Sequence, residues 1–257
     1  MRILLIRHGD PDYENDTLTK KGHKEAALLA KTAKDLQVGD CYMSPLGRAQ
    51  CTAGYTLREL SLTAKTLDWL REFPAQVDLN RSEELRAAYT DTRMENGVYM
   101  PRIAWDMVPS YWTEHPEYMD YDKWRTSEVA RVSDIVPLYD EVTASFDRLL
   151  ADYGYVRENN HYRVERESTQ TITLFCHFGV TCVLLSHLWH VSPFVLWHSL
   201  VTLTTSVTEV VSEEREKGWA YFRAKRIGDI SHLYAGYEEP SFAARFCETF
   251  SNKEQRH

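Results

Sequence analysis

The sequence predicts an α/β fold, a three-layer sandwich in which a mostly parallel sheet has helices on both faces and an inserted cap segment. Unbroken apolar runs at residues 3–6 and 171–176 are typical of strands buried on both faces of a parallel sheet. Strand and helix patterns alternate through most of the 257 residues. We therefore expect a single domain over residues 1–257, with an aromatic-rich cap inserted at about residues 75–130.

Elements in the first half of the chain follow one another at short intervals. After the strand at residues 3–6, apolar residues at helical spacing predict a helix over about residues 18–36, with Thr19 as its N-cap. Residues 41–43 form a second short strand. Ser44 and Pro45 then suggest a cap followed by proline in the first helical turn, and they predict a helix over about residues 47–60. Residues 66–70 are expected to form another short strand.

The second half contains an irregular segment and then regular elements again. Between about residues 71 and 132 the hydrophobic period is lost, and tyrosines and tryptophans crowd among prolines and acidic residues. Because no polar linker flanks this segment, we interpret it as an insertion. Ser133 is expected to cap a helix that ends near residue 150. A helix at about residues 179–189 and strands at 203–211 and 219–226 should follow, and the tail at 240–250 is expected to be helical.

Composition and charge restrict the classes of partner. The net charge is −8 and no cluster of Lys and Arg occurs, which argues against nucleic-acid binding. No apolar run has the length and continuity of a signal-peptide core or a membrane span, so no membrane partner is expected. The five cysteines are odd in number and form no C-x-x-C pair, which favours a reduced, cytoplasmic setting.

Two histidines occupy equivalent positions in two strand-and-turn units. His8 lies in Arg7-His8-Gly9, directly after the first apolar strand, and His177 follows the strand at residues 171–176. In open α/β sheets, ligands bind outside the carboxyl ends of the strands. Gly179 opens the next helix, whose first N–H groups are available to an anion. The two histidines are therefore expected to face each other across one pocket.

Arg48 supplies a third piece of the same pocket. It falls in the first turn of the helix that follows the strand at residues 41–43. An arginine near a helix N-terminus is unfavourable for the helix dipole, and a bound anion would explain its presence. Arg7 and Arg48 both carry a fork-shaped guanidinium group that can clamp phosphate oxygens.

Several motifs occur in order along the chain: L-I-R-H-G at residues 5–9, Leu18-Thr19 with Gly22, S-P-L-x-R-A-x-x-T-A at 44–53, His177, and Gly228-Asp229 with Ser231-His232-Leu233. Together they resemble the histidine phosphatase superfamily, also called the phosphoglycerate mutase-like family. The resemblance covers nearly the whole chain except roughly residues 75–165.

The resemblance implies a role for each residue of the pocket. His8 would be the nucleophile that becomes phosphorylated, and Arg7, Arg48 and His177 would complete the phosphate pocket. The matching position for the general acid, which protonates a poor alkoxide leaving group, is Glu72. The implied activity is metal-independent hydrolysis of a small phosphorylated metabolite, as in a histidine acid-type phosphatase, with no cofactor.

Three positions depart from the family pattern: Glu14 stands where members often have asparagine, Phe73-Pro74 follows the acid in place of a glycine-containing run, and Phe178 separates the second histidine from Gly179. Glu83 and Glu84 are alternatives for the acid. A phosphoglycerate mutase is the nearest rival function, although the arginine-histidine-tyrosine run that usually follows the acid in the family's mutases is missing at residues 73–75. A non-catalytic protein that binds a phosphorylated ligand is a second rival.

Other residues leave further alternatives. His187 and His190 are spaced for a shared metal, but no carboxylate or cysteine is spaced to join them, so no metal site is expected. The aromatic residues between Tyr99 and Trp124 could form ordinary packing, the face of a homodimer or a mobile substrate lid. Arg93 and Arg102, on or beside this segment, are candidates for binding a second anionic group of the substrate.

Overall fold

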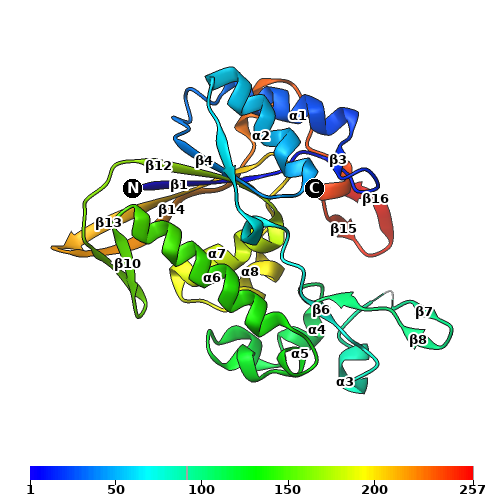
Figure 1. Ribbon diagram of the computed structural model, residues 1–257. Helices are drawn as coiled ribbons and strands as arrows, with labels where there is room; N and C mark the ends of the chain where they lie inside the picture. The colour runs from blue at the N-terminus through cyan, green and yellow to red at the C-terminus, as the bar shows by residue number, and fades with distance from the viewer. Residues whose placement is uncertain (91, 257) are drawn as a thin grey trace.

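A central eight-stranded sheet forms the middle layer of the protein, which we describe from a computed structural model that covers residues 1–90 and 92–256 (Figure 1). The strand order is β10 (Tyr155–Glu158), β11 (His161–Val164), β14 (Trp219–Asp229), β13 (Val207–Glu216), β1 (Arg2–Arg7), β12 (Thr171–Cys176), β4 (Asp40–Met43) and β5 (Ala64–Thr66). Strands β1, β12, β4 and β5 are mutually parallel, whereas the pairs from β1 to β10 are antiparallel. The predicted α/β fold is confirmed, but the sheet is mixed rather than mostly parallel, because tight hairpins connect β13 to β14 and β10 to β11.

Helices cover both faces of this sheet. Helices α1 (Lys20–Lys31) and α2 (Gly47–Leu60) lie on one face, and α6 (Ile135–Asp152), α7 (Phe178–Trp189) and α8 (Pro193–Ser199) lie on the other (Figure 1). Alternate side chains of β1 pack into the two layers: Leu4 and Ile6 join the core beneath α1 and α2, and Ile3 and Leu5 join the core beneath α6 and α7. This double burial explains why the strand reads as an unbroken apolar run.

The helix boundaries agree with most of the local signals. Thr19 caps α1 by accepting a hydrogen bond from the Gly22 N–H at 3.1 Å. Helix α2 spans the predicted residues, but its N-cap is Leu46, so the prediction that Ser44 caps it is wrong. The Ser44 hydroxyl is instead hydrogen-bonded to His177. Helix α6 has Asp134 as its N-cap, while the predicted cap, Ser133, accepts from the N–H of Ile135.

Residues 75–130, called the insertion below, form short elements at one side of α7 and α8 (Figure 1). They are β6 (Gln76–Val77), α3 (Glu83–Arg86), β7 (Met94–Glu95), β8 (Val98–Tyr99), β9 (Arg102–Ile103), α4 (Pro109–Trp112), the 3-10 helices Pro116–Met119 and Lys123–Thr126, and α5 (Glu128–Arg131). Its aromatic residues divide into two groups. Tyr111, Tyr118 and Trp124 are buried in the main core, whereas Trp105 and Trp112 are half-buried at its edge.

Two other segments differ from expectation. The strand expected at residues 66–70 ends at Thr66 and gives way to a 3-10 turn, Asp68–Leu70. The tail does not form a helix. It contains a 3-10 turn, Phe242–Ala244, and a hairpin of β15 (Cys247–Thr249) and β16 (Asn252–Arg256). Within the described residues, no helix has the length and apolar character required to cross a bilayer.

Candidate active site

The predicted site residues follow four adjacent parallel strands and lie at one edge of the sheet. His8 follows β1, His177 follows β12, and Arg48 lies in the first turn of the helix after β4. Glu72 comes after β5 and its 3-10 turn. Because β5, β4, β12 and β1 are parallel neighbours, their carboxyl ends meet at the same edge, as a ligand site in an α/β sheet requires.

The two histidines face each other as the sequence predicts. Their ring centroids are 5.0 Å apart with an interplanar angle of 57°, and both residues are buried. The His8 Nδ1 lies 2.7 Å from the Gly9 carbonyl oxygen, which assigns the proton to Nδ1 and leaves the Nε2 lone pair free. The His177 Nε2 is hydrogen-bonded to the Ser44 hydroxyl at 2.8 Å. One imidazole thus keeps a ring nitrogen free, while the other is hydrogen-bonded to a hydroxyl group.

Burial and positive charge keep both rings neutral. Burial, aided by the charge of Arg7, lowers the pKa of His8 to about 3, although the Gly9 carbonyl partly opposes the shift. Burial also lowers the pKa of His177 strongly, and His8, Arg48 and Arg7 add to that effect. A neutral imidazole retains the lone pair that attacks phosphorus, so the low pKa of His8 suits a nucleophile.

Two arginines bring positive charge to the histidines. Arg7 is half-buried and donates from Nη1 to the carbonyl oxygen of Thr202, while Arg48 is only 9% exposed. In the part of the chain that the structure describes, the Nε atoms of both arginines are buried without a hydrogen-bond partner. Buried donors that lack an acceptor cost free energy, and an anion at this position would satisfy them.

A carboxylate that the sequence analysis did not single out already occupies part of this region. Asp16 Oδ1 pairs with Arg48 Nη1 at 2.7 Å, and Oδ2 accepts from the N–H of Gly47, the first residue of α2, at 2.6 Å. Partial burial of Asp16 opposes ionisation, but the hydrogen bonds from Gly47 and Arg48 outweigh it and lower the pKa of this carboxyl. Glu14, the departure noted in the sequence, is exposed to solvent.

Glu72 lies at the N-terminal end of α7. Its Oε1 accepts hydrogen bonds from the N–H groups of Phe73 at 2.9 Å and Val180 at 3.2 Å. Burial raises the pKa of Glu72, although these two bonds and the charge of Arg7 partly oppose the shift. A raised pKa favours the protonated form that a general acid needs.

Gly179 allows this approach of Glu72. A Cβ atom at residue 179 would lie 2.7 Å from Glu72 Oε1 and 2.8 Å from the ring of Trp105. The alternative acids are placed elsewhere: Glu84 bonds to the Tyr111 hydroxyl and pairs with His115, and Glu83 is exposed on α3. The geometry therefore favours Glu72 over Glu83 and Glu84.

Hydrogen bonds from residues distant in sequence hold the His8 loop. The N–H of Gly9 donates to the Thr52 hydroxyl at 2.9 Å, and the N–H of Thr205 donates to the His8 carbonyl at 3.1 Å. Thr205 is bonded in turn to His232 Nε2 at 2.9 Å. Thr52 and His232 both lie in the motifs quoted above, but their function as supports of the loop depends on contacts that the sequence does not show.

His187, on α7, and His190, its C-cap, are not arranged for a metal. His187 is hydrogen-bonded to both carboxylate oxygens of Asp147, at 2.9 and 2.8 Å, while the ring of His190 packs on Tyr121. Among the described residues, no group of three His, Cys, Asp or Glu side chains is placed to hold a metal ion.

The histidine phosphatase superfamily (branch 1) model matches residues 3–99, and the resemblance that the motifs indicate is confirmed. A search of curated proteins finds no match. The fold is similar to a phosphoserine phosphatase from Entamoeba histolytica, at 16% identity and a TM-score of 0.53, over 90% of this chain and 98% of that one. It is also similar to a mycobacterial glucosyl-3-phosphoglycerate phosphatase, at 16% identity and a TM-score of 0.55, with the same coverages. An alpha-ribazole phosphatase from Shigella flexneri has 18% identity and a TM-score of 0.51, over 90% and 97% of the two chains.

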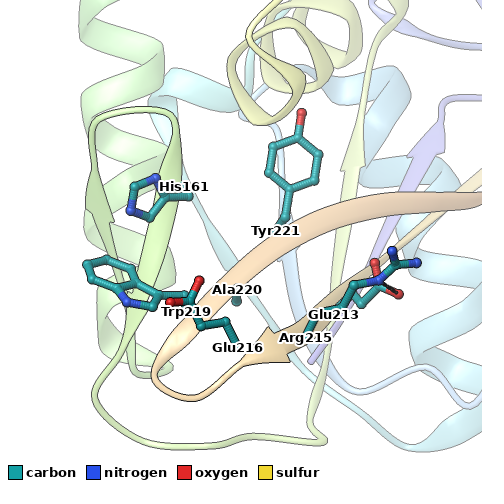
Figure 2. Close-up of a pocket in the computed structure, with 7 residues that line it drawn as sticks. All are labelled: His161, Glu213, Arg215, Glu216, Trp219, Ala220 and Tyr221. Carbon is teal, nitrogen blue, oxygen red and sulfur yellow. Dashed lines mark hydrogen bonds and ion pairs between the residues drawn. The ribbon is translucent and has the colours of Figure 1, made fainter.

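A separate groove of about 280 Å³ lies between the β10–β11 and β13–β14 hairpins (Figure 2). His161 and Trp219 contact each other there, with ring centroids 4.5 Å apart. In β13, Val207 pairs with Ile6 and Val211 pairs with Arg2, so the later residues of β13 extend past the amino end of β1. The groove is therefore at the opposite end of the sheet from His8 and takes no part in the site.

Proposed function

We propose that this protein is a phosphomonoester hydrolase that acts through a phosphohistidine on His8, on a small phosphorylated metabolite. The observation that carries the proposal is the meeting of a buried neutral His8, two arginines and a carboxyl group of raised pKa at one sheet edge. The fold shared with three phosphatases supports the same class of reaction. The arginines supply the positive charge that phosphoryl transfer requires, so the reaction is proposed to need no metal.

In the first step, His8 Nε2 attacks the phosphorus atom of the substrate. The N–P bond forms while the P–O bond to the alcohol breaks, and the Glu72 carboxyl gives its proton to the departing oxygen. Arg7 and Arg48 stabilise the charge on the three other phosphoryl oxygens. His177, which is hydrogen-bonded to Ser44, donates a hydrogen bond to one of these oxygens.

In the second step, water attacks the phosphohistidine. The Glu72 carboxylate takes a proton from this water, the new O–P bond forms, and the N–P bond breaks. Inorganic phosphate leaves, and His8 returns to its neutral form with Nε2 free. One carboxyl group can thus act as the acid in the first step and as the base in the second. The raised pKa of Glu72 favours the protonated form that the first step needs.

A mutase and a non-catalytic binder are the rival functions. A mutase must return the phosphoryl group to a second hydroxyl of a bound acid, and residues 73–75 lack the basic run that usually follows the acid in mutases of this superfamily. A binder has no need of a free nucleophilic nitrogen at His8.

We also propose that the protein acts in the cytoplasm. All five cysteines are free, as is usual in a reducing compartment, and this supports the proposal. A homodimer stays a prediction.

The experiment is to trap the intermediate. Rapid acid-free quenching with ³²P-labelled phosphoester should give label that is stable to alkali, labile to acid and lost in His8→Ala. His161→Ala, a histidine in the groove at the other end of the sheet, serves as the matched control and should be labelled like wild type. Labelling of His8→Ala, or its turnover at more than about a tenth of the wild-type rate, would contradict the proposal, since removing a nucleophile costs on the order of 10³-fold or more.

A further inference from the structure

A large aromatic cleft lies beside the proposed phosphate site. Its volume is about 870 Å³, and its lining includes six aromatic residues from segments far apart in the sequence: Tyr13, Trp105, Trp112, Phe178, Trp197 and Phe246. This volume is typical of pockets for drug-sized ligands and far exceeds what serine or glycerate would fill. The rings of Trp105 and Trp197 lie 5.4 Å apart and form one wall.

The cleft opens onto the residues that would bind phosphate. Phe178 directly follows His177, and its ring centroid is 6.0 Å from the Arg7 guanidinium carbon. The ring of Tyr13 lies 5.4 Å from the guanidinium carbon of Arg48. Phosphate held by the arginines would therefore direct its ester oxygen, and the alcohol beyond it, towards this cleft.

The proposed acid is a neighbour of Trp105, which lines the cleft. Glu72 Oε1 and the Trp105 ring both lie within 2.9 Å of the position of a Cβ atom on Gly179, so the carboxyl and the indole are immediate neighbours. An acid is required for alkyl leaving groups and much less for phenols. Its position indicates that the scissile oxygen is bonded to an alkyl carbon and that the rest of the alcohol contacts the aromatic walls.

The charged residues around the cleft argue against a second anionic group on that alcohol. Among the described residues, no lysine or arginine lines the cleft. Its one carboxylate, Asp106, is paired with Arg102 at 2.8 Å. Arg102 and Arg93, which the sequence offered for a second anionic group, line a different groove of about 270 Å³. Neither arginine lines the aromatic cleft, and their function in binding a second anionic group stays a prediction.

His198 does not supply positive charge either. Its Nδ1 lies 2.6 Å from the Phe194 carbonyl oxygen, and its Nε2 accepts from the N–H of Met107 at 3.2 Å. Both bonds are satisfied by the neutral ring, and burial lowers the pKa of His198. The ring of Trp112 stacks on it, with centroids 5.0 Å apart. The imidazole thus forms part of the apolar wall.

Resting on the proposed hydrolase function, we propose that the substrate is an alkyl phosphate whose alcohol carries a bulky, uncharged aromatic or heteroaromatic ring. The ring packs against the aromatic walls of the cleft, the alkyl linker passes Glu72, and the phosphate binds at Arg7 and Arg48. Small phosphorylated acids fit the phosphate end of this site but leave the cleft empty. They also bring a carboxylate to a cleft that no described lysine or arginine lines.

The test compares kcat/KM for three probes: 2-phenylethyl phosphate, ethyl phosphate and 3-phosphoglycerate. We expect kcat/KM for 2-phenylethyl phosphate to be roughly tenfold or more above kcat/KM for the other two probes, because apolar contacts in a pocket discriminate between substrates by about that factor. Equal kcat/KM values for 2-phenylethyl and ethyl phosphate, or a preference for 3-phosphoglycerate, would overturn the inference.

Two variants connect the preference to the cleft. Trp112→Ala should reduce the ratio of 2-phenylethyl to ethyl phosphate turnover by about three- to tenfold, the usual size of an aromatic contact, and Trp112→Phe should restore most of it. Trp219→Ala, in the groove of Figure 2, removes the same side chain at the other end of the sheet and should leave the ratio unchanged. An unchanged ratio in Trp112→Ala would contradict the assignment.

Trapping separates this inference from the proposed function. If all three probes label His8 and are hydrolysed equally well, the hydrolase stands and the substrate class is wrong. If none of the probes labels His8 and none is hydrolysed, the proposed function itself fails, and the substrate class fails with it.

Discussion

Glu72→Gln is the substitution that separates the proposed acid from a structural carboxyl. Glu72 Oε1 accepts from the N–H groups of Phe73 and Val180, and the amide oxygen of glutamine can accept the same two bonds. The variant should therefore fold, with a change in the free energy of unfolding below about 1 kcal/mol. What it loses is the proton that the carboxyl gives to the leaving oxygen.

The expected size of that loss depends on the leaving group. General acid catalysis contributes about 10²–10⁴-fold, or roughly 3–5 kcal/mol of the barrier, when the leaving alkoxide is poor. An alkyl phosphate should lose that factor, whereas 4-nitrophenyl phosphate, whose phenolate leaves without protonation, should lose less than about tenfold. Since burial raises the pKa of Glu72, alkyl-phosphate turnover in the wild type should persist above the usual carboxyl range and fall as pH rises through the raised value.

The assay is single-turnover release of the alcohol from a series of phosphoesters of graded leaving-group pKa, for wild type and Glu72→Gln. The slope of log rate against leaving-group pKa should be steeper in the variant. Glu84→Gln, on the insertion and bonded to Tyr111, is the matched control and should keep the wild-type slope. Equal losses on alkyl and aryl substrates, with unchanged slope, would refute the acid function of Glu72.

Further predictions concern the rest of the site. Asp16→Asn removes the carboxylate paired with Arg48, so inhibition by inorganic phosphate should tighten by up to about fivefold, the range of a partly exposed ion pair, while Asp12→Asn on the same loop should change little. Weaker inhibition in Asp16→Asn would show that the carboxylate orders the site instead. Because the pKa of His8 is about 3, its ¹⁵N shifts between pH 5 and 8 should stay those of the neutral Nδ1–H tautomer, and a midpoint near 6.5 would refute this assignment. Gly179→Ala pushes a methyl group against Glu72 and Trp105 and should lower alkyl-phosphate turnover about tenfold or more, with melting temperature as the check on folding. Vanadate should inhibit and EDTA should leave turnover unchanged, whereas activity restored by zinc or magnesium after EDTA would revive a metal mechanism.

The parts of the fold that local sequence determines were predictable. Thr19 caps α1 through a residue three positions away, and the apolar run of β1 needs no knowledge of its neighbours to be read as a buried strand. The approach of His8 and His177 was predictable because both follow strands of one sheet, and such ends meet at one edge. Glu72 could be placed only through the family resemblance, since nothing in its local pattern indicates burial.

Contacts between distant segments account for what the sequence did not reveal. Asp16 meets Arg48 across 32 positions, and its own loop has no feature that distinguishes it from the neighbouring carboxylates. In the tail, Phe242, Phe246 and Phe250 have helical spacing, but no apolar surface receives all three: Phe250 is fully exposed, and Phe242 packs against Arg256. Amphipathic spacing predicts a helix only where a partner face is present to bury it.

The division of the insertion into cleft-lining and core aromatics limits how substrate preference can change. Trp105 and Trp112 line the cleft, yet Tyr118 and Trp124 of the same segment are fully buried and pack against Phe194 of α8. If the cleft selects the substrate as proposed, residues 75–130 contribute to both specificity and folding, and exchanging the whole segment would also remove core residues. Replacing it with a glycine-serine loop should leave the protein unfolded rather than promiscuous. Substrate preference should therefore change, in evolution or in the laboratory, through single substitutions of cleft-lining residues. The buried residues of the same segment have to be kept.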